Sequence, residues 1–186
     1  MSTRFRRALW WETCGLKSDS AGRVINPRSG DVIWYHGSRT TTDPTEKEPQ
    51  SGTIYLSDST AHAELYACGA YLYPEKMTRE TAVIFECEVY AGISKIFDYR
   101  KLSTDVRVRQ LAVSVFGQDV SNLDSDYEWY DNTFNGRAKS QLVDAGFVGW
   151  LEGGTYIDLA LLWSFADRVR VQGEIGVPRE VMKKYF

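Results

Sequence analysis

Short apolar runs, each bounded by polar residues, recur along this chain and predict strands more often than helices. Residues 32–35 and 54–56 are β-branched and aromatic runs of the kind that form short buried strands. Residues 82–90 alternate in part between apolar and polar positions and predict a longer strand. Residues 156–165 are strongly apolar apart from Asp158 and predict a central strand. Further short strands are predicted at 96–98, 147–151 and 169–171.

Other segments have the composition of helices and loops. A helix is predicted over 61–71, capped by Asp58, Ser59 or Thr60 and ended before Pro74. The other predicted helices are 106–116, which also fits a strand, 137–144 and 180–185, and polar loops are predicted at 40–52 and 119–135. Because strands and helices do not alternate regularly, the pattern predicts an α+β fold rather than a doubly wound sheet.

The composition narrows the classes of protein that this pattern allows. The chain has 186 residues, of which 43% are apolar, and this predicts a single domain over residues 1–186 with its own core. A net charge of −3 gives no general attraction to nucleic acid or to anionic lipid, although a local basic patch stays open. No apolar run is long enough for a signal peptide or a membrane span, so we expect no membrane partner and a cytoplasmic location.

Cysteine and histidine are both scarce. Cys14, Cys68 and Cys87 are too few and too scattered for a disulfide framework, and their odd number fits a reducing compartment. The two histidines, His36 and His62, have no Cys-x-x-Cys motif to complete a metal site, so we expect none. His62 is expected on the surface of the predicted helix.

The dipeptide His36-Gly37 ends the first predicted strand. Without a Cβ, Gly37 would let a ligand approach its backbone N–H and C=O, which together suit a primary amide such as the carboxamide of nicotinamide. A neutral imidazole at His36 could accept a hydrogen bond from a ribose hydroxyl. Taken alone, the dipeptide is a weak signal, and a structural role explains it equally well.

Tyr55 and Tyr66 lie on the second predicted strand and on the helix that follows it. Each ring has a face that can stack and an edge that can hydrogen-bond, so two such rings could hold a flat heterocycle between them. The ring quadrupole also favours a cationic pyridinium. Taken alone, the pair fits two core aromatics better.

Asp158 is the third candidate, because a carboxylate inside an apolar strand is costly unless it is hydrogen-bonded or faces a cavity. Near a ribose, it could stabilise the positive charge that develops as a glycosidic bond opens. The structural alternative is an ion pair with Arg137, Arg168 or another base.

Together these pieces resemble the ADP-ribosyltransferases of the His-Tyr-Glu group, which includes diphtheria toxin and the poly(ADP-ribose) polymerases. That group carries a His-Gly-Ser/Thr motif at a strand end, a Gly-x-x-Tyr strand, a second tyrosine on the next helix and an acidic residue in a late apolar strand. The matching residues are His36-Gly37-Ser38, Gly52-Thr53-Ile54-Tyr55, Tyr66 and Asp158, and the order covers residues 31 to about 171.

The resemblance implies a split, bent pair of small β-sheets with flanking helices and with NAD, as substrate, in the cleft. By the same resemblance, His36 contacts the adenosine ribose, Gly37 holds the carboxamide and Ser38 lies beside them. Tyr55 and Tyr66 pack around nicotinamide, and Asp158 contacts the nicotinamide ribose. Asp158, Tyr55 and His36 are the expected catalytic residues. No metal is implied.

Two positions depart from the group. Asp158 stands where the group usually has a glutamate, so its carboxylate reaches one methylene less far. Ala63 stands where polymerases often have a serine that contacts the carboxamide, and Ser57 could take that place. The aspartate puts the catalytic rate in doubt more than the binding of NAD.

These features favour mono-ADP-ribosylation of a macromolecule by a small effector or toxin, and the acidic charge favours a protein acceptor without excluding nucleic acid. Two alternatives stay open. One is an NAD glycohydrolase that uses the same residues with water as acceptor. The other is a module that binds NAD or ADP-ribose and has lost catalysis, for which the shorter acid at Asp158 is the motive.

Overall fold

Strands and helices follow one another in the order that the sequence predicts. The computed structural model describes residues 16–69, 82–98, 100, 104–116, 137–153 and 155–185. In this part of the chain seven strands form one sheet, in the order β4-β5-β6-β2-β1-β3-β7. The strands are β1 (Ile33–Ser38), β2 (Thr53–Ser57), β3 (Val83–Val89), β4 (Ile96–Asp98), β5 (Gly149–Glu152), β6 (Asp158–Leu162) and β7 (Val169–Gly176). The predicted α+β class is confirmed.

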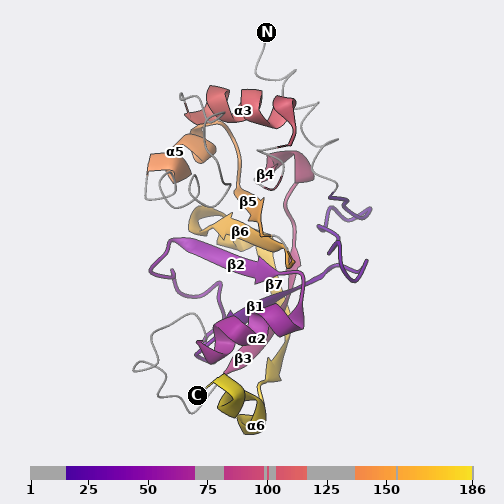
Figure 1. Ribbon diagram of the computed structural model, residues 1–186, viewed down its shortest axis with the longest axis vertical. Coiled ribbons are helices and arrows are strands. Elements are labelled where there is room, and N and C mark those ends of the chain that lie inside the picture. Colours follow the sequence, from indigo (N-terminus) through magenta and orange to yellow (C-terminus); the bar gives the residue numbers. More distant parts are fainter. Residues whose placement is uncertain are drawn as a thin grey trace.

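The helices lie at the two ends and on one side of this sheet (Figure 1). The α-helices of the described residues are α2 (Thr60–Cys68), α3 (Val106–Phe116), α5 (Arg137–Asp144) and α6 (Arg179–Met182). Short 3-10 helices occur at Ile93–Lys95, Trp163–Arg168 and Lys183–Tyr185. The predicted loop 119–135 lies outside the described residues. No helix of the described chain is both long enough and apolar enough to cross a bilayer.

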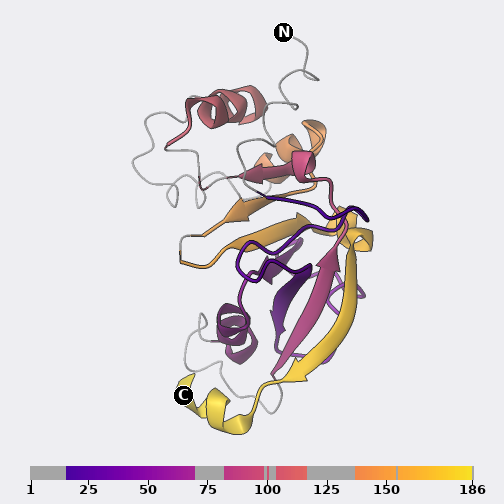
Figure 2. The ribbon, with the colours of Figure 1, turned by 90° about the vertical axis from the view of Figure 1, so that its right-hand side faces the viewer.

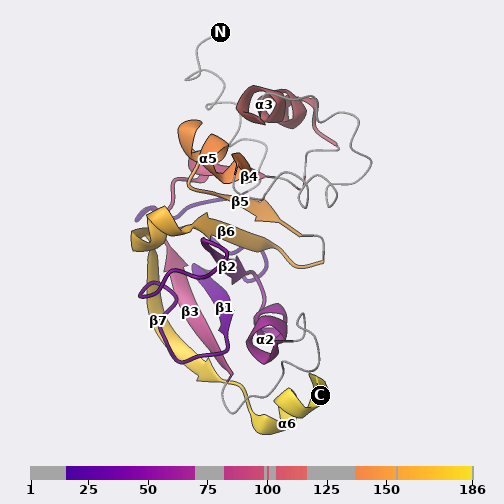
Figure 3. The ribbon, with the colours of Figure 1, turned by 90° about the vertical axis from the view of Figure 1, so that its left-hand side faces the viewer.

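The sheet opens between β1 and β2. All six residues of β1 pair with β3, and all five residues of β2 pair with β6. Within the described strands, β1 and β2 share a single residue pair, Tyr35 opposite Ser57. Figures 2 and 3 show that β1, β3 and β7 lie at a steep angle to β5 and β6. The expected split therefore takes the form of one sheet with two halves, β4-β5-β6-β2 and β1-β3-β7, which the pair of Tyr35 and Ser57 joins.

Helix α2 lies directly on β1 because Gly37 has no side chain. A Cβ built on Gly37 would lie 1.9 Å from the carbonyl oxygen of Ala63 and 2.8 Å from the backbone nitrogen of Ala67. The helix ends earlier than predicted, since Gly69 takes the left-handed conformation of a C-cap with φ of 72°. Gly37 therefore has a packing role as well as the ligand role expected for it.

The core consists of several clusters, and the largest one contains residues from both halves of the sheet. Trp34 is fully buried in the largest cluster, and its Nε1 donates to the carbonyl of Val24 at 3.1 Å. A second cluster joins α3 and α5 to the β4–β5 end of the sheet. Val108 and Ala112, four residues apart and both buried, explain why 106–116 forms a helix rather than a strand.

Two predicted strands near the C-terminus differ in length from the observed ones. The apolar run 156–165 contributes five residues to β6 and then continues as the 3-10 helix Trp163–Arg168. The strand predicted at 169–171 extends to Gly176, because β7 pairs with β3 along its length, with a bulge after Glu86. Long-range pairing, rather than local periodicity, sets both lengths.

Candidate functional site

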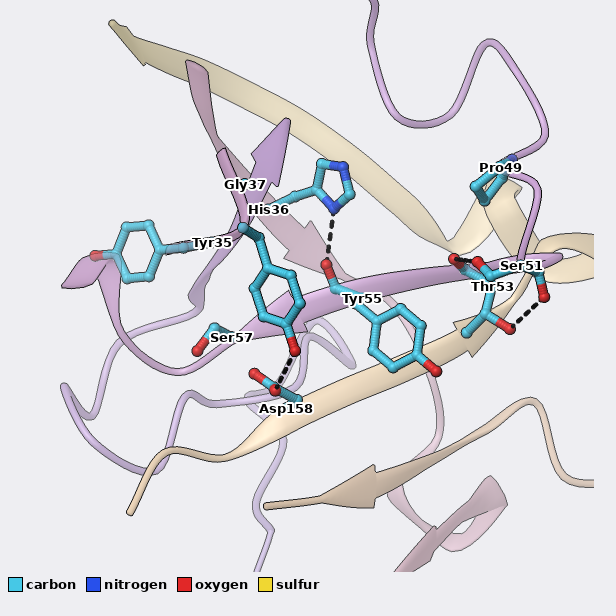
Figure 4. A pocket seen from close by; sticks show the side chains of 10 residues that line it. Tyr35, His36, Gly37, Pro49, Ser51, Thr53, Tyr55, Ser57 and Asp158 are labelled. Atoms are coloured by element: carbon cyan, nitrogen blue, oxygen red, sulfur yellow. Dashed lines mark hydrogen bonds between the residues drawn. The ribbon is translucent and has the colours of Figure 1, made fainter. Parts of the chain in front are cut away.

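A pocket of about 150 Å³ lies where the sheet opens (Figure 4). Its walls come from β1, β2, β6, α2 and the loop between β1 and β2. The lining residues are Tyr35, His36, Gly37, Pro49, Ser51, Thr53, Tyr55, Ser57, Tyr66 and Asp158. A cavity of about this volume accommodates one aromatic ring.

Six of the seven site residues expected from the sequence line this pocket, although Asp158 is more than a hundred positions from His36. The six are His36, Gly37, Tyr55, Ser57, Tyr66 and Asp158. Ser38 is the seventh and lies at the end of β1, outside the lining. Its Oγ accepts the N–H of Thr40 at 3.1 Å, as in a turn that ends a strand.

His36 bridges the opening between β1 and β2. Its Nδ1 lies 2.7 Å from the backbone oxygen of Tyr55 (Figure 4). Since a carbonyl only accepts, Nδ1 carries the proton and donates. Burial lowers the pKa of His36, which favours the neutral imidazole. In that form Nε2 is an acceptor, which suits a hydroxyl donor such as that of a ribose.

The two tyrosines reach the pocket from different elements. The Tyr55 ring on β2 packs edge-on against Trp150, with ring centroids 6.3 Å apart. Tyr66 on α2 points its hydroxyl at Asp158, with 3.5 Å between the oxygen of Tyr66 and Oδ2. The pocket thus brings the rings of Tyr55 and Tyr66 beside one carboxyl group, and Tyr35 of β1 is a third tyrosine in its lining.

Asp158 opens β6 opposite Ser57 of β2 and is only 4% exposed. Burial raises the pKa of Asp158, while the charge of His62 and hydrogen bonds from Ser57 and His62 act in the opposite direction. Arg168 does not form the ion pair expected as the structural alternative, since it lies beside Asp167 at 3.7 Å. The other base that this alternative allowed is His62, whose Nδ1 lies 3.1 Å from Oδ1 of Asp158. The side chain of Arg137 lies outside the described residues.

His62 lies beside Asp158 and not on the helix surface that its sequence position predicted. It was expected on the helix surface, but its side chain is 12% exposed and its Nδ1 lies 3.1 Å from Oδ1 of Asp158. The signal for this contact was present, because His62 and Tyr66 are four residues apart and therefore share one helix face. Because this face carries Tyr66, a predicted site residue, His62 should have been expected to point toward the site as well.

Ser57, His62 and Asp158 do not form a serine-hydrolase relay. The hydroxyl of Ser57 lies 3.2 Å from Nδ1 of His62, and the carboxylate of Asp158 contacts the same nitrogen. In that relay, serine and aspartate bond to opposite nitrogens of the ring. The shared nitrogen makes Ser57 and His62 supports for Asp158 instead.

A charged pair lies behind the carboxyl group. Asp58 is buried, and its Oδ2 lies 3.2 Å from Nε of Arg28. The guanidinium of Arg28 also lies over the ring of Tyr156, 5.2 Å from the centroid. The negative charge of Asp58 contributes to raising the pKa of Asp158.

The loop between β1 and β2 closes one side of the pocket with Pro49 and Ser51. Lys139 of α5 donates from Nζ to the backbone oxygen of Ser51. This bond fixes the loop to a helix that is more than eighty positions away in the chain. Among the described residues, no group of three or more His, Cys, Asp or Glu side chains could hold a metal ion.

This arrangement has a definite chemical capacity. A backbone glycine and a neutral imidazole offer hydrogen bonds, two tyrosines offer ring faces, and one buried carboxyl group can stabilise positive charge. Such a site suits a ligand that has a flat ring joined to a sugar, with charge developing at the bond between them.

Comparisons with known proteins add little to this geometry. No protein-family model and no curated protein matches the sequence. One solved structure, described as the M. tuberculosis MbcT–MbcA toxin–antitoxin complex, is similar over 99% of this chain and 98% of that chain, with 13% identity and a TM-score of 0.47. A likeness at this level says nothing about function.

Proposed function

We propose that this protein is a mono-ADP-ribosyltransferase that cleaves NAD between nicotinamide and ribose and transfers ADP-ribose to a macromolecule, in the first place a protein. One observation carries the proposal. Asp158 lies in the same pocket as His36, Gly37 and the two tyrosines, although separate elements supply them. Their chemistry suits the nicotinamide half of NAD, and the resemblance of these motifs to the His-Tyr-Glu group supports the same assignment.

The reaction assigns each residue a role. Tyr55 and Tyr66 would pack on the pyridinium, and the backbone of Gly37, with Ser57, would bind the carboxamide. The bond from C1′ of the ribose to the pyridinium nitrogen breaks, and its electron pair leaves with neutral nicotinamide. Asp158 would stabilise the oxocarbenium-like ribose until a nucleophile of the acceptor attacks C1′ and loses its proton.

The other half of NAD would extend beyond the pocket. His36 would accept a hydrogen bond from the adenosine ribose, for which its neutral form is suited. Ser38 follows at the end of β1 and would contact the part of NAD outside the described lining.

The test uses NAD labelled separately in nicotinamide and in adenylate, incubated with purified protein and a host lysate. We expect release of labelled nicotinamide together with adenylate label on a macromolecule that is digested by protease. Asp158→Asn should lower the rates at which both signals appear about 10²- to 10³-fold, and Glu174→Gln on the exposed edge strand β7 should change neither. If folded protein at high concentration left all of the NAD uncleaved, the proposal would be overturned.

Hydrolysis of NAD is the second candidate, and the burial of Asp158 favours it. The carboxyl group is 4% exposed and touches both His62 and Tyr66, so water reaches it more easily than a macromolecular nucleophile does. A glycohydrolase would release nicotinamide and free ADP-ribose in equal amounts without an acceptor. The same labelled NAD distinguishes the two activities.

A module that binds NAD without cleaving it is the third candidate. The observation that favours it is the aspartate at position 158, which is shorter than the glutamate of the His-Tyr-Glu group. Calorimetry would then show NAD binding to the wild-type protein without release of nicotinamide. Asp158→Glu would restore the longer carboxylate, and a gain of cleavage in that variant would support this assignment.

A further inference from the structure

We propose that His62 is a positioning residue, which holds the carboxylate of Asp158 through Nδ1 while the ring of Tyr156 holds the imidazole. The inference deepens the proposed function and rests on it for its catalytic consequence. The contacts themselves belong to the folded protein and can be measured without NAD.

His62 donates a hydrogen bond to the carboxylate of Asp158. Asp158 is 4% exposed, and a buried carboxylate needs donors to remain charged. Nδ1 of His62 lies 3.1 Å from Oδ1, and an ionised carboxylate only accepts, so Nδ1 carries the proton. The hydroxyls of Ser57 and Tyr66 approach the same pair, at 3.2 Å from Nδ1 and 3.5 Å from Oδ2. The contact of His62 with Asp158, at 3.1 Å, is shorter than that of Tyr66.

Two tyrosine rings orient the imidazole of His62. The ring of His62 is stacked on Tyr156, with centroids 4.6 Å apart and planes within 14°. The ring of Tyr66 meets it edge-on at 5.1 Å. These two contacts set the plane of the imidazole and therefore the direction in which its Nδ1–H points.

Arg28 in turn supports Tyr156. Arg28 lies over the Tyr156 ring and donates from Nη2 to the backbone oxygen of Thr155 at 2.6 Å. Its Nε lies 3.2 Å from Oδ2 of the buried Asp58. The segment before β1, the start of α2 and the turn before β6 therefore meet around one histidine.

The placement of His62 argues for positioning rather than contact with substrate. Asp158, Tyr66 and Ser57 line the pocket, whereas His62 is not among the lining residues. Ser57 and Asp158 both approach Nδ1, so that nitrogen is already occupied. His62 therefore acts on the reaction through Asp158.

The charges around Asp158 act in opposite directions. His62 favours the carboxylate, and Asp58 disfavours it. Glu152 pairs with Asp158 across β5 and β6, and its Oε2 accepts the indole N–H of Trp150 at 2.7 Å. Since His62 supplies a hydrogen bond that favours the anion, its removal should make Asp158 harder to ionise.

The test compares three substitutions of His62. His62→Asn keeps a donor near the place of Nδ1, His62→Phe keeps a flat ring on Tyr156 without a donor, and His62→Gln moves the donor to the far end of the side chain. The first readout is the titration of the Asp158 carboxyl carbon by NMR in the absence of NAD, with Asp158→Asn to assign the resonance. Glu174→Gln serves as the matched surface control.

We expect the pKa of Asp158 to rise in the Phe and Gln variants and to rise less in the Asn variant, because His62 favours the carboxylate. We expect kcat for nicotinamide release to fall about 100-fold in the Phe and Gln variants, with KM within about threefold of wild type. The Asn variant should recover a large part of this loss.

Cooperative melting identifies the variants that are folded. If the pKa of Asp158 is unchanged in a folded Phe or Gln variant, the positioning role is overturned. A loss of activity that is equal in all three variants would also overturn it, since the position of the donor would then not matter. Wild-type protein that titrates as expected and releases no nicotinamide would refute the proposed function and leave the positioning of Asp158 standing.

Discussion

Asp158 is a carboxyl group whose surroundings act in both directions on its charge. Burial and Asp58 favour the protonated form, whereas His62 and Ser57 favour the carboxylate. The group therefore ionises at higher pH than an exposed aspartate does, and small changes around it should shift its titration. A residue poised in this way, in a pocket, is typical of a functional site.

The raised pKa of Asp158 predicts opposite pH trends in stability and activity. The folded state binds this proton more tightly than the unfolded state does. The stability it contributes is therefore full below the unfolded pKa and is lost as pH rises through the folded pKa. Activity needs the carboxylate, so kcat/KM should rise with pH through the same range.

Urea unfolding and nicotinamide release, each measured from pH 4 to 8, check this prediction. Asp158→Asn should remove the contribution of this group to the stability profile and should lower kcat about 10²- to 10³-fold. A rate profile whose acid limb lies at or below the ordinary aspartate value would contradict the assignment of Asp158.

At the scale of elements, the contact between α2 and β1 places half of the site. Gly37 allows the backbone of the helix at Ala63 to meet the strand, and the same helix carries His62 and Tyr66 toward Asp158. The tight contact of helix and strand thus fixes the distance between the tyrosine and the carboxyl group.

Gly37→Ala should move α2 away from β1, since a Cβ would lie 1.9 Å from a backbone oxygen that cannot rotate away. We expect a loss of about 1–3 kcal/mol in the free energy of unfolding, together with a loss of NAD binding. Gly149→Ala is the matched control, because its Cβ would lie 2.1 Å from the backbone oxygen of Ala160, outside the pocket lining.

Denaturant melts and calorimetry at a temperature where both variants are folded separate the two effects. Both alanines should destabilise the protein, and Gly37→Ala should weaken NAD binding further. Equal binding by the two variants would show that the approach of α2 to β1 does not set the pocket.

The bond from Lys139 to the loop also belongs to this scale. Lys139→Met keeps an unbranched side chain one atom shorter but loses the donor to Ser51, so one wall of the pocket should loosen. Loss of one hydrogen bond, about 0.5–1.5 kcal/mol, predicts a Kd for NAD that is about 2- to 10-fold weaker. Calorimetry with Lys183→Met as an exposed control measures this, and an unchanged Kd would remove the loop from the binding site.

At the scale of the whole molecule, the pocket lies between two halves of one sheet. His36 and Gly37 belong to the β1-β3-β7 half, and Tyr55 and Asp158 belong to the other. Within the described strands, Tyr35 opposite Ser57 is the one backbone pair that joins the halves. A ligand in the pocket would therefore add contacts between the two neighbouring strands that share the fewest backbone pairs.

NAD should stabilise the folded protein and slow amide exchange along β1 and β2 more than along β3 and β7. At a concentration of 100 times Kd, the gain in the free energy of unfolding is about 2.7 kcal/mol. A thermal shift assay and hydrogen exchange with and without NAD, using Asp158→Asn to prevent turnover, measure both effects. A uniform change in exchange over all strands would contradict binding between the halves.

The sequence by itself determined the kinds and order of the elements. Apolar alternation and helical spacing are local properties, so β3, β4, α3 and α5 begin and end within a residue or two of their predicted positions. The sequence also indicated Asp158 as a site residue, since an acid inside an apolar run is unusual wherever its partners lie in the chain. The resemblance to the His-Tyr-Glu group joined these residues before any contact was known.

Only the tertiary structure decided how these elements meet. The lengths of β6 and β7, the opening between β1 and β2 and the contact of α2 with Gly37 depend on pairs far apart in the chain. His62 shows the reason most clearly. Its helical position was predicted, but its partner Asp158 is 96 residues away, and no local pattern fixes which side of a helix faces a distant strand.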